Sequence, residues 1–219
     1  MDKQQAARPS LDLVEFVEQN ILPRYNSFDA AHNLEHVTRV IRNALLLVPK
    51  TGADADMVYV VAAYHDLGME GPRAVHHLTS GKILAKDVRL KRWFSDEKIR
   101  IMKEAVEDHR ASASHEPRSI YGKIVAEADR DLDVSTVLRR TIQFGLSHYP
   151  EKSKEEQYER FRQHLLEKYS EHGYIRLWIQ GSANETQLKE LRKVIANEQQ
   201  LRQRFEELMR SEERMRSEE

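Results

Sequence analysis

The sequence of 219 residues contains no cysteine, few glycines and prolines, and no excess of charge of either sign. The absence of cysteine excludes disulfide bonds, thiolate metal sites and a cysteine nucleophile, and it fits a reducing compartment. The 35 basic and 36 acidic residues leave a net charge of −1, so no overall field attracts nucleic acid or an anionic membrane. No apolar run reaches the roughly 20 residues that cross a bilayer, and segment 1–10 has no apolar signal region. We therefore expect a soluble cytoplasmic protein that binds neither nucleic acid nor membranes.

Helical periodicity dominates what the sequence does contain, and no strand-like alternation extends beyond a few residues. We predict an all-α fold in a single domain over residues 1–219, with a core at about 25–135 and a charged helical extension at about 151–219. The segment 28–48 should begin near Asp29 as its cap and end before Pro49. A loop is expected over 111–119. The predicted helices cover residues 10–22, 28–48, 54–68, 77–94, 96–110, 120–146, 151–173 and 184–219.

The last of these helices carries a thin apolar stripe. Sustained heptads are absent over most of its length, which favours docking on the domain over a coiled coil. Pairing with a second copy of the chain remains an alternative, so a homo-oligomer formed through the C-terminal helices is also considered. The stripe consists of Leu188, Leu191, Val194, Ile195, Leu201, Phe205 and Leu208.

Histidines and aspartates stand at the ends of several apolar segments. His32 and His36 are four residues apart, on the inward stripe of the predicted helix 28–48. His65 and Asp66 close the very apolar segment 54–66, and Asp129 follows another apolar segment. Burying an imidazole or a carboxylate costs several kcal/mol, on the order of 2–7, unless the group is paired or binds a metal. Two imidazoles and two carboxylates can hold a divalent ion, and a buried polar network without metal is the alternative.

The motifs "HVTRV" (His36), "YHDLG" (His65, Asp66) and "EADRDLD" (Asp129) resemble the signature of the HD-domain metal-dependent phosphohydrolases. The resemblance covers about residues 25–135. It implies a helical HD-domain bundle in which His36, His65, Asp66 and Asp129 hold a divalent metal ion. It also implies hydrolysis of a phosphate ester or anhydride of a small molecule by metal-activated water, with nucleotides favoured.

Two further motifs resemble elements of branches of this superfamily. "HNLEH" is similar to the HNxxH element of cyclic-nucleotide phosphodiesterases, which implies that His36 binds metal and that His32 donates a proton to the leaving oxygen. "HLTSGKIL" and "VEDHR" resemble elements of the two-metal HD-GYP branch. They imply a second ion at His77 and His109, bridged by Asp66, or phosphate donors at these histidines if one ion is bound.

The same comparison sets limits on the function. Met69 replaces the lysine of the HD-GYP branch and no GYP tripeptide follows His109, so cleavage of cyclic-di-GMP is disfavoured. We expect the neighbouring His76 not to be a metal or phosphate ligand. The mixed ligand set leaves the metal open among Mn, Fe, Co, Ni, Zn and Mg. Basic residues near the motifs could bind the phosphorylated substrate, namely Arg73, Lys82, Arg110 and Arg130.

A rival interpretation from another class is a metal- or nucleotide-binding helical sensor. In that case the charged C-terminal helices would engage a partner, and the domain would bind metal without turnover.

Overall fold

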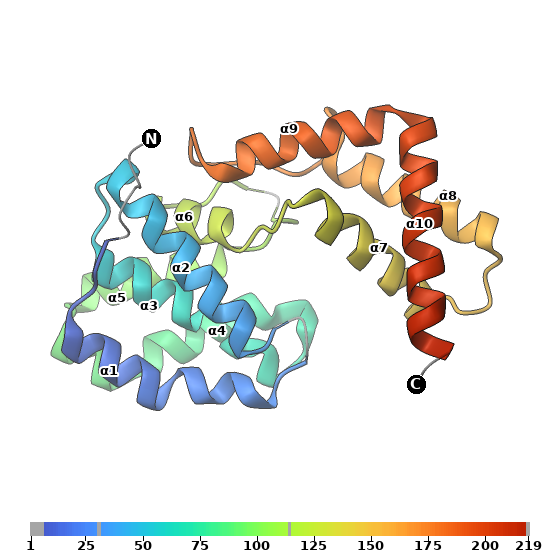
Figure 1. Cartoon of the computed structure of the whole chain (residues 1–219). Helices are drawn as coiled ribbons and strands as arrows, with labels where there is room; N and C mark the ends of the chain where they lie inside the picture. Colours follow the sequence, from blue (N-terminus) through green and yellow to red (C-terminus); the bar gives the residue numbers. More distant parts are fainter. Residues whose placement is uncertain (1–6, 30–31, 114, 218–219) are drawn as a thin grey trace. The chain divides into compact units, whose positions relative to one another are not determined.

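The computed structural model describes residues 7–29, 32–113 and 115–217. Within these residues the chain forms ten α-helices, four short 3₁₀ helices and no strand, which confirms the all-α prediction (Figure 1). Contacts within the chain group it into two compact units, Met1–Arg130 (unit 1) and Asp131–Glu219 (unit 2). The single HD-type domain over residues 1–219 stays a prediction.

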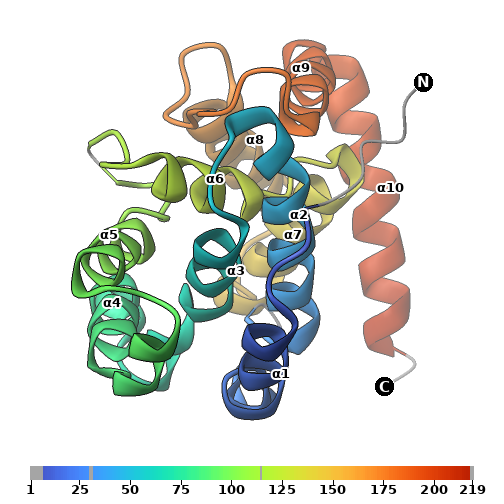
Figure 2. The ribbon, with the colours of Figure 1, turned by 90° about the vertical axis from the view of Figure 1, so that its left-hand side faces the viewer.

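Unit 1 is built around one central helix, α3. Figure 2 shows α3 between its neighbours, and it contacts α1, α2, α4, α5 and α6. All side chains from 57 to 64 are buried, as expected for a helix that is apolar on every face. The α-helices of unit 1 are α1 Leu11–Asn20, α2 Leu34–Thr51, α3 Ala55–Tyr64, α4 His76–Lys86, α5 Asp96–Glu107 and α6 Ile120–Ala128. The 3₁₀ helices are η1 Leu22–Ser27, η2 Leu67–Glu70, η3 Arg73–Val75 and η4 Val88–Arg92.

Helix α2 differs from its predicted bounds at both ends. The Asn33 side chain accepts a hydrogen bond from the His36 N–H (3.0 Å), so the helix begins at Leu34, later than the expected cap at Asp29. At the other end, the helix continues through Pro49 to Thr51. Proline removes the bond to the Leu45 carbonyl, and that oxygen instead accepts the N–H of Ala7 (3.3 Å).

Polar caps divide several of the predicted helices. The segment 54–68 ends as an α-helix at Tyr64 and continues as η2, and the segment 77–94 divides into α4 and η4. Residues 120–146 form α6 and α7 because Asp133 accepts the N–H of Thr136 (2.8 Å) and starts a new helix. Asn197 accepts the N–H of Gln200 (3.0 Å) and starts α10 in the same way. Short polar side chains compete for backbone N–H groups, which periodicity alone does not reveal.

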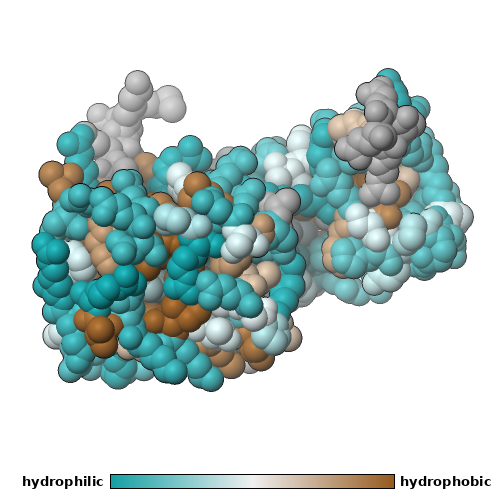
Figure 3. All heavy atoms as spheres, turned by 90° about the horizontal axis from the view of Figure 1, so that it is seen from below, coloured by the Kyte–Doolittle hydropathy of each residue, from teal (hydrophilic) through white to brown (hydrophobic). Residues whose placement is uncertain are grey.

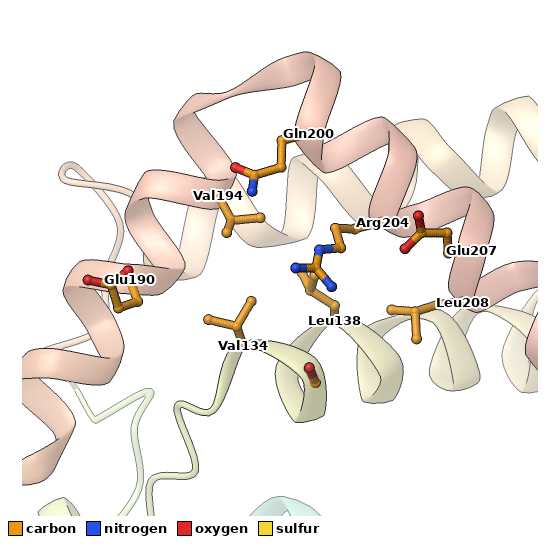
Figure 4. A pocket seen from close by; sticks show the side chains of 9 residues that line it. Val134, Leu138, Glu190, Val194, Gln200, Arg204, Glu207 and Leu208 are labelled. Atoms are coloured by element: carbon orange, nitrogen blue, oxygen red, sulfur yellow. The ribbon is translucent and has the colours of Figure 1, made fainter.

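Unit 2 uses most of the predicted apolar stripe in its own core. The rings of Phe161 and Phe205 lie 5.2 Å apart, and Leu188, Leu191, Ile195 and Leu201 are buried. This packing places most of the stripe in the core of unit 2, and both docking on the HD core and pairing of two chains stay predictions. The helices are α7 Val134–His148, α8 Lys154–Tyr169, α9 Ala183–Ala196 and α10 Glu198–Ser217. A cavity of about 350 Å³ between α7, α9 and α10 is lined by Val134, Leu138, Val194, Leu208, Arg204 and others (Figure 4).

The surface of unit 1 seen from below is mainly hydrophilic, with hydrophobic side chains in separate groups (Figure 3). Among the described helices, none combines the length and the apolar character that crossing a membrane requires.

A close approach of backbones joins η2 to the start of α4. The Gly68 N–H donates to the Ser80 hydroxyl (2.8 Å), and a Cβ on Gly68 would lie 2.0 Å from the His76 carbonyl oxygen. The nearby backbone of α4 is therefore the reason why position 68 requires glycine. The conformation of Gly68 itself does not require it, because its φ is not in the left-handed region.

The first prediction concerns this contact. Gly68→Ala should lower the free energy of unfolding by about 1–3 kcal/mol, because α4 must move to admit the methyl group. Gly71→Ala is the matched control: its Cβ would meet nothing closer than 3.7 Å, so its effect should stay within about 0.5 kcal/mol. Urea unfolding followed by circular dichroism measures both variants. Equal stability of the two variants would contradict the close packing of η2 on α4.

Candidate metal centre

Three helix ends of unit 1 bring the predicted ligands together. His36 lies in the first turn of α2, at the place set by the Asn33 cap. His65 and Asp129 are the residues at which α3 and α6 end, and Asp66 follows His65. The carboxyl end of a helix carries partial negative charge, so two of these three ends favour a cation.

The first group of ligand atoms is compact. His36 Nε2 lies 3.3 Å from His65 Nε2, 3.4 Å from Asp66 Oδ2 and 3.2 Å from Asp129 Oδ1. His65 Nε2 lies 3.1 Å from Asp66 Oδ2. His65 is fully buried, Asp66 is 3% exposed, and 27% of the Asp129 side chain is exposed. Ligand atoms of His36, His65 and Asp66 all lie within 4.8 Å of one another, so this group can hold a metal ion with Asp129 beside it.

A second group shares Asp66 with the first. Its other oxygen, Oδ1, lies 3.3 Å from His76 Nε2 and 3.5 Å from His109 Nε2, and these two nitrogens are 3.1 Å apart. This group also meets the geometry of a metal site. One buried carboxylate thus faces two histidine pairs, one with each oxygen.

The backbone sets the tautomer of three of these histidines. The Nδ1 atoms of His65, His76 and His109 lie 2.7, 2.8 and 2.6 Å from the carbonyl oxygen three residues earlier in the chain. A carbonyl only accepts, so each Nδ1 carries a hydrogen. Each Nε2 is then the atom that can offer a lone pair to a metal ion, once any proton on it has left. Metal-binding histidines are held in this way by a partner on the other ring nitrogen. The donor set therefore fits one or two divalent ions.

His36 has a different partner. Its Nδ1 lies 3.0 Å from Nη2 of Arg39, and a guanidinium only donates. This contact favours a proton on Nε2, which then faces Asp129 and Asp66. A cation at His36 Nε2 must displace that proton.

The electrostatics of the centre favour positive charge. Burial lowers the pKa of His36, but hydrogen bonds to Asp129 and Asp66 outweigh it and raise the pKa to about 9. Burial would raise the pKa of Asp66, yet attraction to His65 and the other imidazoles holds it well below its usual range. The pKa of Asp129 is lowered as well, where the hydrogen bond from His36 outweighs burial. Without metal, protons on the imidazoles supply the positive charge that a divalent ion would otherwise bring to the centre.

The structure brings together His36, His65, Asp66, Asp129 and His109, whereas His77, the other residue predicted for a second ion or a phosphate, lies outside both groups. The imidazole that meets His109 belongs to His76. Successive residues of a helix point about 100° apart, so only one of two adjacent histidines can face Asp66. The inward face of α4 is the one that carries His76, because Ser80 and Leu84, four and eight residues later, are both buried in the structure. His77 lies outside the centre, and burial followed by the charge of Arg110 lowers its pKa to about 4.

The candidate proton donor lies next to the first group. The ring centroid of His32 is 6.1 Å from that of His36. His32 Nδ1 lies 2.7 Å from Oδ1 of Asp29, the residue that the sequence predicts as a helix cap. A carboxylate on Nδ1 leaves Nε2 as the atom that can act on a substrate.

The basic residues that were predicted to bind the substrate lie in different environments. Arg110 donates to the Ala74 carbonyl (3.0 Å) beside the second group. Arg130 is buried and donates to the carbonyl of Ala126, and burial lowers its pKa. Lys82 is exposed on a face of α4 other than that of His76. Arg73 is also exposed, and its Nη1 lies 3.9 Å from Asp29.

The second prediction is a pH dependence of stability. The pKa of His36 is raised from 6.5 to about 9 on folding, so its contribution is complete below pH 6.5 and is lost as the pH rises through about 9. Metal-free protein should lose up to about 3 kcal/mol over this interval. Saturating Mn²⁺ should abolish the loss, because metal binding strengthens as protons leave. Urea unfolding at pH 6 and pH 9, with chelator or with Mn²⁺, measures both effects. A loss that persists with Mn²⁺ would contradict metal binding at His36.

Comparison with known proteins agrees with this geometry. A family model described as HD domain matches residues 33–132. No curated protein and no solved structure gives a significant match to the chain. HD domains are all-α and bind divalent metals, and the matched segment contains every ligand of both groups. The match identifies an HD domain at residues 33–132, which is consistent with the HD-domain superfamily.

Proposed function

We propose that this protein is a metal-dependent phosphohydrolase that cleaves a phosphate ester or anhydride of a small molecule, with nucleotides favoured. One observation carries the proposal: the buried Asp66 directs one oxygen to His36 and His65 and the other to His76 and His109. The HD-domain family consists mainly of hydrolases, which supports the same reaction class.

The chain's residues prepare the centre for phosphoryl chemistry. A divalent ion bound there supplies Lewis-acid activation of water and screens the charge of the phosphoryl oxygens. Asp66 positions the reacting groups between the two histidine pairs, and the backbone carbonyls keep the Nε2 lone pairs of His65, His76 and His109 directed inward. Preorganised ligands of this kind need no rearrangement during the reaction.

His32 is the proposed general acid. Water adds to phosphorus and the bond from phosphorus to the leaving oxygen breaks, so that oxygen takes up a proton. His32 Nε2 donates it, while Asp29 accepts the Nδ1–H and stabilises the charged imidazole. Asp29 acts through His32 and is a positioning residue.

The third prediction tests this pair. His32→Asn should lower kcat by about 10²- to 10⁴-fold with alkyl phosphate substrates, and Asp29→Asn should lower it by about 10- to 100-fold. With p-nitrophenyl substrates the losses should be much smaller, because that leaving group departs without a proton. Metal content, measured by plasma mass spectrometry, should equal that of the wild type. Equal losses on both substrate types would contradict a proton donor at His32.

The fourth prediction tests the reaction class. Purified protein should hydrolyse at least one member of a panel of phosphomonoesters, phosphodiesters and nucleotides with Mn²⁺, Co²⁺, Ni²⁺ or Mg²⁺. His65→Ala with Asp66→Ala should remove both turnover and bound metal, whereas Lys86→Gln, an exposed change on α4, should retain both. Metal binding by the wild type without any turnover would favour the sensor interpretation. Equally little metal in wild type and double variant would contradict the centre itself.

Other attributes remain predictions of this proposal. They are a cytoplasmic location, a small phosphorylated substrate with neither nucleic acid nor membrane as partner, and self-association through the C-terminal helices.

A further inference from the structure

A pocket of about 630 Å³ in unit 1 lies beside the second histidine pair. Two of its lining residues directly follow the members of that pair: His77 follows His76, and Arg110 follows His109. The ring centroids of His76 and His77 lie 5.7 Å apart, so the pocket lined by His77 lies next to the second histidine pair. A substrate whose phosphate is held at the centre therefore has this pocket within reach of its remaining atoms.

The charges of the pocket leave one cation unmatched. Each lining carboxylate has a cation of its own, in the pairs Glu107 with Lys103, Asp108 with Arg118 and Glu116 with Lys123. Arg110 forms no ion pair with any residue in the described part of the chain, and the only hydrogen bond found for it there is from one Nη atom to the Ala74 carbonyl. Its remaining N–H donors are available to a ligand, and a guanidinium matches the oxygens of phosphate and carboxylate groups.

A second polar group of the pocket lacks a partner. Nδ1 of His77 is buried and makes no hydrogen bond to any described residue. Leaving such a nitrogen unsatisfied costs about 1–3 kcal/mol, whereas the neighbouring His76 satisfies its own Nδ1 with the Arg73 carbonyl. The two adjacent histidines thus differ in position: His76 belongs to the second ligand group, and His77 lines the pocket.

We infer that this pocket is a substrate subsite in which Arg110 and His77 bind a second anionic group, phosphate or carboxylate, on the molecule whose phosphate is cleaved. The inference rests on the proposed function and narrows its substrate class to small molecules with two anionic groups. Arg110 and His77 are specificity-determining residues in this assignment, since neither belongs to the two ligand groups.

Binding of inert probes to the Mn²⁺-loaded full chain tests the subsite without turnover. The probes are alkylphosphonates with chains of two to five carbons that end in methyl, carboxylate or a second phosphonate. Calorimetry should show at least one doubly anionic probe binding about 10-fold more tightly than its methyl-ended counterpart, and the preferred end group identifies the natural one. Arg110→Gln and His77→Asn should each remove most of that preference and leave binding of the methyl-ended probe and metal content unchanged.

Lys86→Gln serves as the matched control, because it removes one positive charge from α4 outside the pocket and should keep the full preference. Equal binding of all end groups at every chain length would overturn the subsite while leaving the phosphohydrolase proposal intact. If Lys86→Gln lost the preference for doubly anionic probes to the same extent, the preference would come from the overall charge of the protein. That result would also overturn the subsite. Failure of every phosphonate to bind would overturn both proposals.

Discussion

The buried carboxylate of Asp66 is the constraint on which the centre of unit 1 depends. At 3% exposure it has lost nearly all contact with water, and an unpaired charge there would be prohibitively unstable. Imidazole nitrogens next to both of its oxygens stabilise this buried charge. They also form, together with Asp66, two groups in which a cation is favoured. The interaction that stabilises the buried Asp66 thus also forms the two groups that could hold a metal ion, so stability and the candidate metal centre depend on one residue.

Helix ends serve this arrangement in a specific way. The last carbonyls of a helix lack partners within it. The helix α3 ends at Tyr64, so the Ala62 carbonyl is free to accept from His65 Nδ1, and the Val106 carbonyl near the end of α5 accepts from His109 in the same manner. Unsatisfied backbone groups therefore orient the side chains of the candidate metal centre. Placing these histidines in the middle of a helix would remove the acceptor.

Much of the centre could be predicted from residue type alone. His36, His65, Asp66 and Asp129 stand in or next to apolar segments, where polar groups persist only with a partner or an ion, and their order matches a known signature. The all-helical fold followed from periodicity and from the scarcity of glycine and proline. Both inferences use properties of single residues and their spacing, which need no knowledge of how distant segments pack.

The sequence by itself determined the helical class, the four residues of the signature and the reaction class to be tested. Only the tertiary structure decided that His76, and not His77, faces Asp66, because a rotation of about 100° per residue separates neighbours that look equivalent in sequence. It also decided the pairing of His32 with Asp29 and the division of two long helices at Asp133 and Asn197. In each case the outcome depends on which side chain meets which atom in space, and residue spacing along the chain does not contain that information.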